Sequence, residues 1–165
     1  MVKIFGLALR ALELAFTVIL LGLVGALEHQ SSNNPESVHY SMFTAAFSIV
    51  FLIFLIPATW NEGLAGHPII LIIIDGLNVI FFFCAAITLS ARTRGHSCGD
   101  HSFLNSNSIA RGSSSRCHEA QAAAAFFWFG WASYMGSLIL SAISGKSSAN
   151  LRPRPAAQRP GMSQV

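Results

Sequence analysis

Four long apolar stretches alternate with polar segments along the chain. They cover residues 4–27, 42–60, 69–91 and 120–143. A helix rises about 1.5 Å per residue, so each stretch is long enough to cross a hydrocarbon layer of about 30 Å. The pattern predicts an all-α bundle of four transmembrane helices. A cleaved secretory signal is the alternative for the first stretch, but Glu13 precedes its apolar centre, where a signal is normally positive.

The polar connections predict how the four helices follow one another. Residues 28–41 hold Pro35 and an Asn pair, as short exposed loops do. Residues 61–68 are too few to hold a domain, so the third helix must run antiparallel to the second, which Pro57 is expected to end. Residues 92–119 form the longest loop. Residues 146–165 hold three prolines and four basic residues, which predict a disordered tail behind a four-helix domain of residues 1–145.

Composition excludes the soluble classes of protein. Hydrophobic residues make up 53% of the chain and charged residues 10%, against about 25% charged residues in soluble domains. The net charge of +3 is small, and the basic residues lie in polar segments that form no face for a nucleic acid. There is no G-x-S-x-G, no phosphate-binding glycine loop and no H-E-x-x-H, so we predict no catalytic residues and no enzyme.

Four helices place both termini on one side of the membrane, and two signals favour the cytosol. Five basic residues lie on the side of the termini and four in the opposite loops, which is a weak positive-inside preference. Two of the three cysteines bracket the long loop, as a disulfide in an oxidising space would. The basic residues are Lys3, Lys146, Arg152, Arg154 and Arg159 on the first side, and Arg92, Arg94, Arg111 and Arg116 on the other.

Ionisable side chains in the first and third helices need partners, because a charge near the bilayer centre costs about 2.5–3.5 kcal/mol on insertion scales. Counted from the helix starts, Arg10 and Asp75 lie at one depth, and Glu13 and Asn78 lie together at the next. We therefore expect an Arg10–Asp75 pair supported by Glu13 and Asn78. Three roles are open: a packing clamp that selects neighbouring helices, a headgroup or regulatory site, and an ion or proton path.

The long loop supports three interpretations of its cysteines. A disulfide between Cys98 and Cys117 would close a ring of about 20 residues, which chain-entropy arithmetic values at about 3 kcal/mol. A tetrahedral zinc site is the second, and free thiols are the third. The zinc ligands would come from His96, Cys98, His101, Cys117 and His118, whose spacing matches no standard zinc motif. We favour the disulfide and predict no metal.

Small and aromatic residues predict the contacts of the helix faces. Small residues allow close helix packing in lipid, either within one chain or between copies in a homo-oligomer. Tryptophans near the helix ends predict membrane-interface or lipid contacts, including contact with a sterol. The small residues are Gly22, Gly25, Gly130, Ser133, Ser137 and Ser141, and the tryptophans are Trp60, Trp128 and Trp131.

The loop and the fourth apolar stretch carry a specific resemblance. Residues 96–129 read HSCGDHSFLNSNSIARGSSSRCHEAQAAAAFFWF. They closely resemble the corresponding region of the fungal non-classical export protein family, four-span proteins with a MARVEL domain. The resemblance extends to Arg10, to D-G-L-N at residues 75–78, to V-H-Y at residues 38–40 and to the terminal S-Q-V at residues 163–165.

The resemblance implies a multi-pass plasma-membrane protein with both termini in the cytosol. The resemblance also implies that it lies in the sterol-rich compartment of that membrane stabilised by eisosomes. Family members are linked to organising this compartment, to responding to sphingolipid status and to unconventional secretion. It implies membrane lipids and eisosome-associated proteins as partners, and no catalytic residues. We predict no cofactor other than a bound sterol or sphingolipid.

We therefore expect a non-enzymatic protein that organises a lateral plasma-membrane domain. The alternatives are a small transporter or channel that uses Arg10, Glu13 and Asp75, and a trafficking adaptor whose tail recruits cargo. The basic tail would attract anionic lipid, and the chain end at residues 163–165 has the form of a peptide that adds to a PDZ-type sheet edge.

Overall fold

The computed structural model is built from helices. It describes residues 2–31, 33–60 and 68–150, and the side chains of residues 4–31, 33–57 and 69–143 within them. The four long helices are α1 (Val2–His29), α2 (Glu36–Trp60), α3 (Pro68–Thr93) and α5 (Ser114–Asn150), and α4 (His101–Ser106) is a short helix in the long loop. All four long helices have the length and composition to cross a membrane. The predicted all-α bundle with four spans is confirmed.

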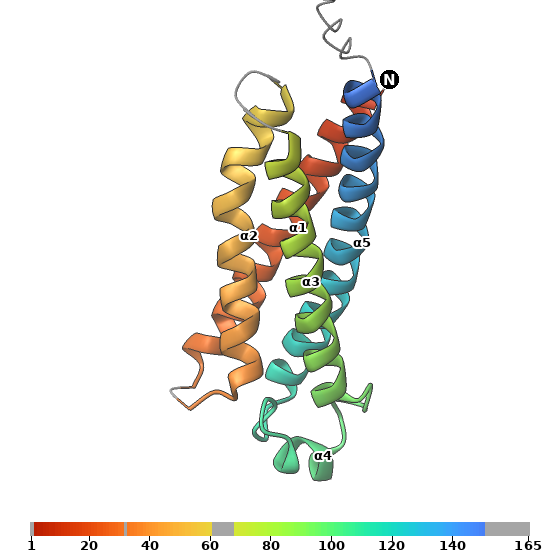
Figure 1. The fold of residues 1–165 in the computed structure, drawn as a ribbon. Helices are drawn as coiled ribbons and strands as arrows, with labels where there is room; N and C mark the ends of the chain where they lie inside the picture. The colour runs from red at the N-terminus through yellow and green to blue at the C-terminus, as the bar shows by residue number, and fades with distance from the viewer. Residues whose placement is uncertain (1, 32, 61–67, 151–165) are drawn as a thin grey trace, which may run out of the picture.

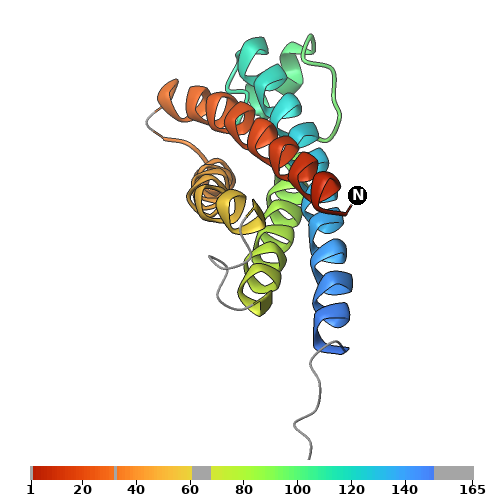
Figure 2. The same cartoon turned by 90° about the horizontal axis from the view of Figure 1, so that it is seen from above.

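The long helices form a bundle in which each helix packs against the helices next to it along the chain, and the first and last, α1 and α5, also pack together. Helix α5 packs against α1 and α3, and α2 packs against the same two helices. Figure 1 shows α2 and α3 running in opposite directions, while Figure 2 shows α1 crossing the bundle obliquely. The start of α1 and the end of α5 lie at one end of the bundle, and α4 lies at the other (Figure 1).

Two helix boundaries differ from the sequence-based prediction. Helix α2 continues through Pro57 to Trp60, because a proline in the last turn removes only one backbone donor and such a loss is tolerated in membrane helices. Helix α5 begins at Ser114, before the apolar stretch. Hydrophobicity marks only the membrane-embedded part of a helix, whereas Arg, Glu, Ala and Gln in residues 116–121 are good helix formers.

The carboxyl-terminal end of α5 also extends further than predicted. The helix reaches Asn150, so residues 146–150 are helical although the sequence pattern placed them in the tail. The rest of the predicted tail, with Arg152, Arg154, Arg159 and the terminal S-Q-V, lies outside the described residues, as does the side chain of Lys146.

An aromatic contact between α3 and α5 forms part of the core. The ring of Phe82 on α3 is fully buried, with its centroid 5.4 Å from Phe127 and 5.0 Å from Tyr134 on α5. Gly130 lies between these two α5 residues along the chain, and a Cβ atom added there would meet Phe82 ring carbons at 2.5 and 2.7 Å. The missing side chain of Gly130 therefore makes room for the Phe82 ring.

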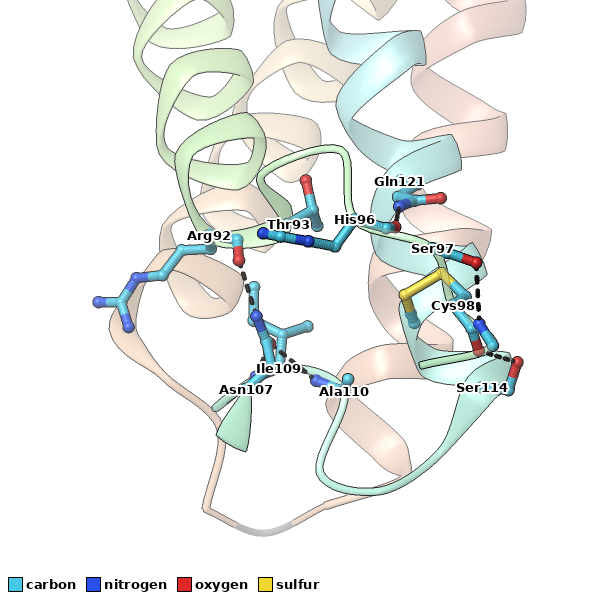
Figure 3. The surroundings of a disulfide bond; sticks show 12 residues. Arg92, Thr93, His96, Ser97, Cys98, Asn107, Ile109, Ala110, Ser114 and Gln121 are labelled. Atoms are coloured by element: carbon cyan, nitrogen blue, oxygen red, sulfur yellow. Dashed lines mark hydrogen bonds between the residues drawn. A yellow bond between two sulfur atoms is a disulfide. The ribbon is translucent and has the colours of Figure 1, made fainter. Parts of the chain in front are cut away.

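The long loop is closed by a disulfide between Cys98 and Cys117, whose Cα atoms are 5.7 Å apart (Figure 3). This confirms the disulfide interpretation and leaves the alternative zinc set without its thiol ligands. Asn107 orders the same loop, since its side-chain oxygen accepts the N–H groups of Ile109 and Ala110 and its amide donates to the Arg92 carbonyl at 2.7 Å (Figure 3). The loop is therefore an ordered structure, held by a disulfide and hydrogen bonds, that caps one end of the bundle.

Arg116 joins this cap to the rest of the bundle, a role that the sequence pattern did not reveal. Its guanidinium is buried and donates to the carbonyls of Ile109 and Leu27 at 2.8 and 3.0 Å, and to the Asn34 side-chain oxygen at 2.8 Å. These acceptors belong to the long loop, to α1 and to the connection between α1 and α2. One side chain therefore ties both loops at this end to α5.

Replacing Gly130 with alanine is expected to destabilise the bundle by about 1–3 kcal/mol, the usual cost of overpacking a filled core. Phe82 cannot move freely because it is packed between Phe127 and Tyr134. Gly25→Ala is the matched control, since its added Cβ would meet nothing within 4 Å. Thermal unfolding of the two variants in lipid nanodiscs measures the difference, and an equal effect of both would contradict the packing described.

Replacing Cys98 and Cys117 together with serine is expected to lower stability by about 3 kcal/mol, because the unfolded chain then regains the freedom that the ring removes. Cys84→Ser is the control, as Cys84 is a free, exposed cysteine on α3. Unfolding temperatures and gel mobility with and without reductant report on the bond. If the double variant and the control unfold alike, the disulfide does not stabilise the cap.

Candidate functional site

A buried ionic cluster joins α1 to α3. Arg10 donates from Nη1 and Nη2 to the two carboxylate oxygens of Asp75, both at 2.6 Å, and Nη1 also donates to Glu13 at 2.8 Å. The side chains of Arg10, Asp75 and Glu13 are 2%, 0% and 0% exposed. The two-pronged pairing with Asp75 fixes both the distance and the orientation of the two helices at this level.

The helical repeat of α1 explains why this cluster faces inward. Arg10, Glu13 and Thr17 follow one another at three- and four-residue spacing and are all buried, so they lie on one face of the helix. The same face continues as Leu20, Val24 and Leu27, which are fully buried and apolar. Helix α1 therefore presents a polar half and an apolar half to the bundle interior.

Hydroxyl groups extend the ionic cluster to all four long helices. Ser137 on α5 donates to the free carboxylate oxygen of Glu13 at 2.5 Å. Thr17 donates to the Glu13 carbonyl and lies 3.0 Å from the hydroxyl of Ser48 on α2, which in turn lies 2.5 Å from the hydroxyl of Tyr134 on α5. We call Arg10, Glu13, Asp75, Thr17, Ser48, Tyr134 and Ser137 the polar network.

Sequence reasoning missed the hydroxyl part of the polar network. Ser48 and Tyr134 were assigned no role, and Ser137 was considered only as a small packing residue. One signal was present in the sequence: Tyr134 lies inside an apolar stretch, whereas tyrosines of membrane helices usually lie at the membrane–water interface. A buried tyrosine hydroxyl needs a partner, and Ser48 supplies it.

Asn78 lies beside the polar network without joining it. Its side chain is fully buried, and its amide donates to the Ile74 carbonyl one turn earlier on α3 at 3.0 Å. Within the described residues its side-chain oxygen has no hydrogen-bond partner. Within the described residues, Asn78 therefore makes no direct hydrogen bond to the Arg10–Asp75 pair that it was expected to support.

The small residues of α5 are used inside the bundle, whereas Gly22 on α1 is not. Ser133 and Ser137 are 8% and 4% exposed, and the Ser133 hydroxyl donates to its own helix at the Phe129 carbonyl. Gly130 packs against Phe82, while Ser141 and Gly25 are half-buried. Gly22 is exposed, so it faces the surroundings of the bundle.

Two of the predicted tryptophans form an outward aromatic face with Phe83. Trp128 is exposed and Trp131 half-buried, and their ring centroids lie 5.8 and 5.7 Å from that of Phe83 on α3. The Trp128 indole N–H donates to the Ser90 hydroxyl at 3.2 Å. We call Phe83, Trp128 and Trp131 the aromatic face. Trp60 ends α2, and its side chain lies outside the described ones.

The arrangement of the ionic cluster is that of a clamp between helices. Lipid gives transmembrane helices no hydrophobic drive to associate, so interhelical hydrogen bonds and close packing hold them together. The charged nitrogens of Arg10 face carboxylate oxygens, and Glu13 also binds Ser137 on α5. Breaking one contact leaves a charge unpaired inside the bundle, which makes the chosen packing specific.

Replacing Arg10 with methionine is expected to cost about 3–5 kcal/mol of stability, because Glu13 and Asp75 then share the buried site without a cation. A triple variant with Arg10→Met, Glu13→Leu and Asp75→Leu is the control, and it should recover most of this loss since no buried charge remains. Unfolding in nanodiscs measures both. A triple variant less stable than Arg10→Met would contradict the clamp.

Comparison with known proteins places the chain in a family. Residues 3–140 match the model of MARVEL, a membrane-associating domain. The chain is 38% identical to non-classical export protein 102 of Candida albicans over 171 residues, covering 100% of both chains. It is 35% identical to non-classical export protein 2 of Saccharomyces cerevisiae, covering 81% of this chain and 77% of the relative. No solved structure gives a significant match.

The homologue of non-classical export protein 2 in Schizosaccharomyces pombe is more distant, at 26% identity over 87% of this chain and 80% of its own. The matches extend over the helices that build the polar network and over the disulfide-closed loop. The chain is a multi-pass membrane protein with a MARVEL domain, and it belongs to the fungal non-classical export protein family.

Proposed function

We propose that this protein organises a lateral domain of the plasma membrane and has no enzymatic activity. The domain would be the eisosome-associated compartment, and the protein would respond there to sterol or sphingolipid. We also propose a link to unconventional secretion, because the relatives are named non-classical export proteins. The partners would be membrane lipids, further copies of this chain and eisosome-associated proteins.

The closed polar network is the observation that carries this proposal. A transport path needs ionisable groups that water or an ion can reach, whereas Arg10, Glu13 and Asp75 are at most 2% exposed and bind one another. Their contacts serve to hold four helices in one packing. A bundle with a fixed interior acts on the membrane through its outer faces.

The disulfide supports a topology with both termini in the cytosol. The bond between Cys98 and Cys117 lies at the end of the bundle that carries α4, opposite the start of α1. Disulfides persist in oxidising compartments such as the cell exterior. This supports the proposal that the loops lie outside the cell and the termini inside, as does the excess of basic residues on the side of the termini.

The outward face of α1 is the surface we propose for self-association. Ala8, Ala11, Ala15 and Gly22 are exposed and recur at three-, four- and seven-residue spacing, so they line one stripe of the helix. Small residues at such spacing let a second helix approach closely in lipid. Gly130, Ser133 and Ser137 on α5, by contrast, are buried inside the bundle.

Replacing Ala15 and Gly22 together with leucine is expected to reduce self-association at least severalfold, because the added side chains hold a second helix away. Ala132→Leu on the exposed side of α5 is the control, since it adds the same bulk elsewhere. Photobleaching steps per spot in the plasma membrane, with fluorescently tagged full-length chains, count the copies.

Unchanged copy number in the α1 variant would refute this surface, and loss of spots in both variants would point to a general effect of bulk. The transporter alternative predicts ion flux into proteoliposomes that Asp75→Asn abolishes, whereas the proposal predicts no flux. The adaptor alternative predicts loss of cargo recruitment with unchanged spots when the chain is cut after Lys146.

A further inference from the structure

The buried ionic cluster holds one more acidic group than basic groups. Arg10, Glu13 and Asp75 lie together inside the bundle and are at most 2% exposed. If all three were ionised, two carboxylates would face one guanidinium, and the buried net charge would be −1. An arginine keeps its charge in proteins. An unbalanced buried charge is costly, and a buried acid usually takes up a proton instead.

No second cation among the described side chains balances this charge. Within the described residues, Glu13 and Asp75 form ion pairs with Arg10 alone. Lys3 precedes Glu13 by ten residues on α1, which is about 15 Å of helix rise. The other acidic and basic residues with described side chains lie at the end of the bundle that carries α4 (Figure 1): Glu28, Glu36, Arg92, Arg94, Asp100, Arg111, Arg116 and Glu119.

The geometry of the cluster distinguishes the two acids. Asp75 accepts from both terminal nitrogens of Arg10, each at 2.6 Å. Paired bonds from a guanidinium favour the ionised form of a carboxyl group. Glu13 accepts only from Nη1, at 2.8 Å, and shares this nitrogen with Asp75. The negative charge is therefore better stabilised on Asp75 than on Glu13.

The second oxygen of Glu13 has a partner that suits a carboxylic acid. It lies 2.5 Å from the hydroxyl oxygen of Ser137 on α5. A hydroxyl can accept as well as donate, so the same contact forms when Glu13 carries a proton and donates it. The acid then turns its carbonyl oxygen to Arg10 and its O–H to Ser137, and both of its oxygens keep a partner.

The other groups of the polar network are neutral. Its hydroxyls come from α1, α2 and α5, and α3 adds the amide of Asn78 beside it. The Asn78 side-chain oxygen is buried and has no hydrogen-bond partner within the described residues, so this amide oxygen adds negative polarity and no cation. Nothing in this part of the chain favours a second carboxylate. The hydroxyls are those of Thr17, Ser48, Tyr134 and Ser137.

We propose that the polar network binds one proton, which Glu13 holds and shares with Ser137. The network is then neutral, with Arg10 and Asp75 as its ion pair and Glu13 as an acid. Loss of the proton leaves a buried negative charge between α1 and α5, and water must enter to solvate it. The contact between these two helices is a latch that the proton keeps closed. This proposal concerns the interior of the bundle and does not depend on the proposed function.

Infrared spectroscopy of the full chain tests the proposal, because the C=O stretch of a carboxylic acid is separate from the bands of a carboxylate. The chain is placed in nanodiscs of ether-linked lipid, which has no ester carbonyl, and its glutamates carry ¹³C in the side-chain carboxyl. We expect a labelled acid band at neutral pH that Glu13→Gln removes. Glu36→Gln is the matched control and should keep the band, since Glu36 is exposed at the start of α2.

Unfolding temperatures in the same nanodiscs give a second readout. Glutamine is neutral and offers one acceptor and one donor, as a protonated Glu13 does. Glu13→Gln should therefore unfold at the wild-type temperature at neutral pH. When the pH is raised until the acid band disappears, the unfolding temperature of the wild type should fall further than that of Glu13→Gln, because only the wild type gains a buried charge.

Three results would overturn the proposal. The first is a wild-type chain without a labelled acid band at neutral pH, or a Glu13→Gln variant that does not fold. The second is an acid band that appears with labelled aspartate and not with labelled glutamate, which would place the proton on Asp75. The third is an unfolding temperature that rises with sodium or potassium concentration at constant pH while the acid band is absent, which would show a metal cation in place of the proton.

Discussion

The pairing of Arg10 with Asp75 is the constraint on which the rest of the bundle depends. A guanidinium cannot stay unpaired within hydrocarbon, so α1 and α3 must meet at the depth where both oxygens of Asp75 face Arg10 at 2.6 Å. Glu13 then lies against Ser137 of α5, and Thr17 lies against Ser48 of α2. One ion pair thereby sets the register of four helices.

The two ends of the bundle are stabilised by different means. Inside the apolar layer, hydrogen bonds and close contacts such as Gly130 on Phe82 select the packing. At the end that carries α4, the disulfide and Arg116 hold the loops together with a small buried hydrophobic cluster around Leu104 and Ala110. The outer faces of α1, α3 and α5 remain available for lipid and for other copies.

Much of this architecture could be predicted from the sequence. The length of the apolar stretches predicts four spans, and counting residues from the helix starts brings Arg10 and Asp75 to one depth, where their side chains meet. The contact of Ser48 with Tyr134 could not be predicted, because it depends on how far each helix is rotated and crossed. The role of Arg116 could not be predicted for a related reason. Its acceptors are two backbone carbonyls and one side-chain amide, and no sequence pattern shows that these groups will meet it.

The central claim is that a closed, inert bundle acts on the membrane through its outer faces. Its most direct test is native mass spectrometry of the unaltered chain, extracted from its own membrane in polymer-bounded lipid discs. The account predicts a defined oligomer that retains sterol or sphingolipid. A lipid-free monomer would contradict it and would return attention to Arg10, Glu13 and Asp75 as parts of a transport path.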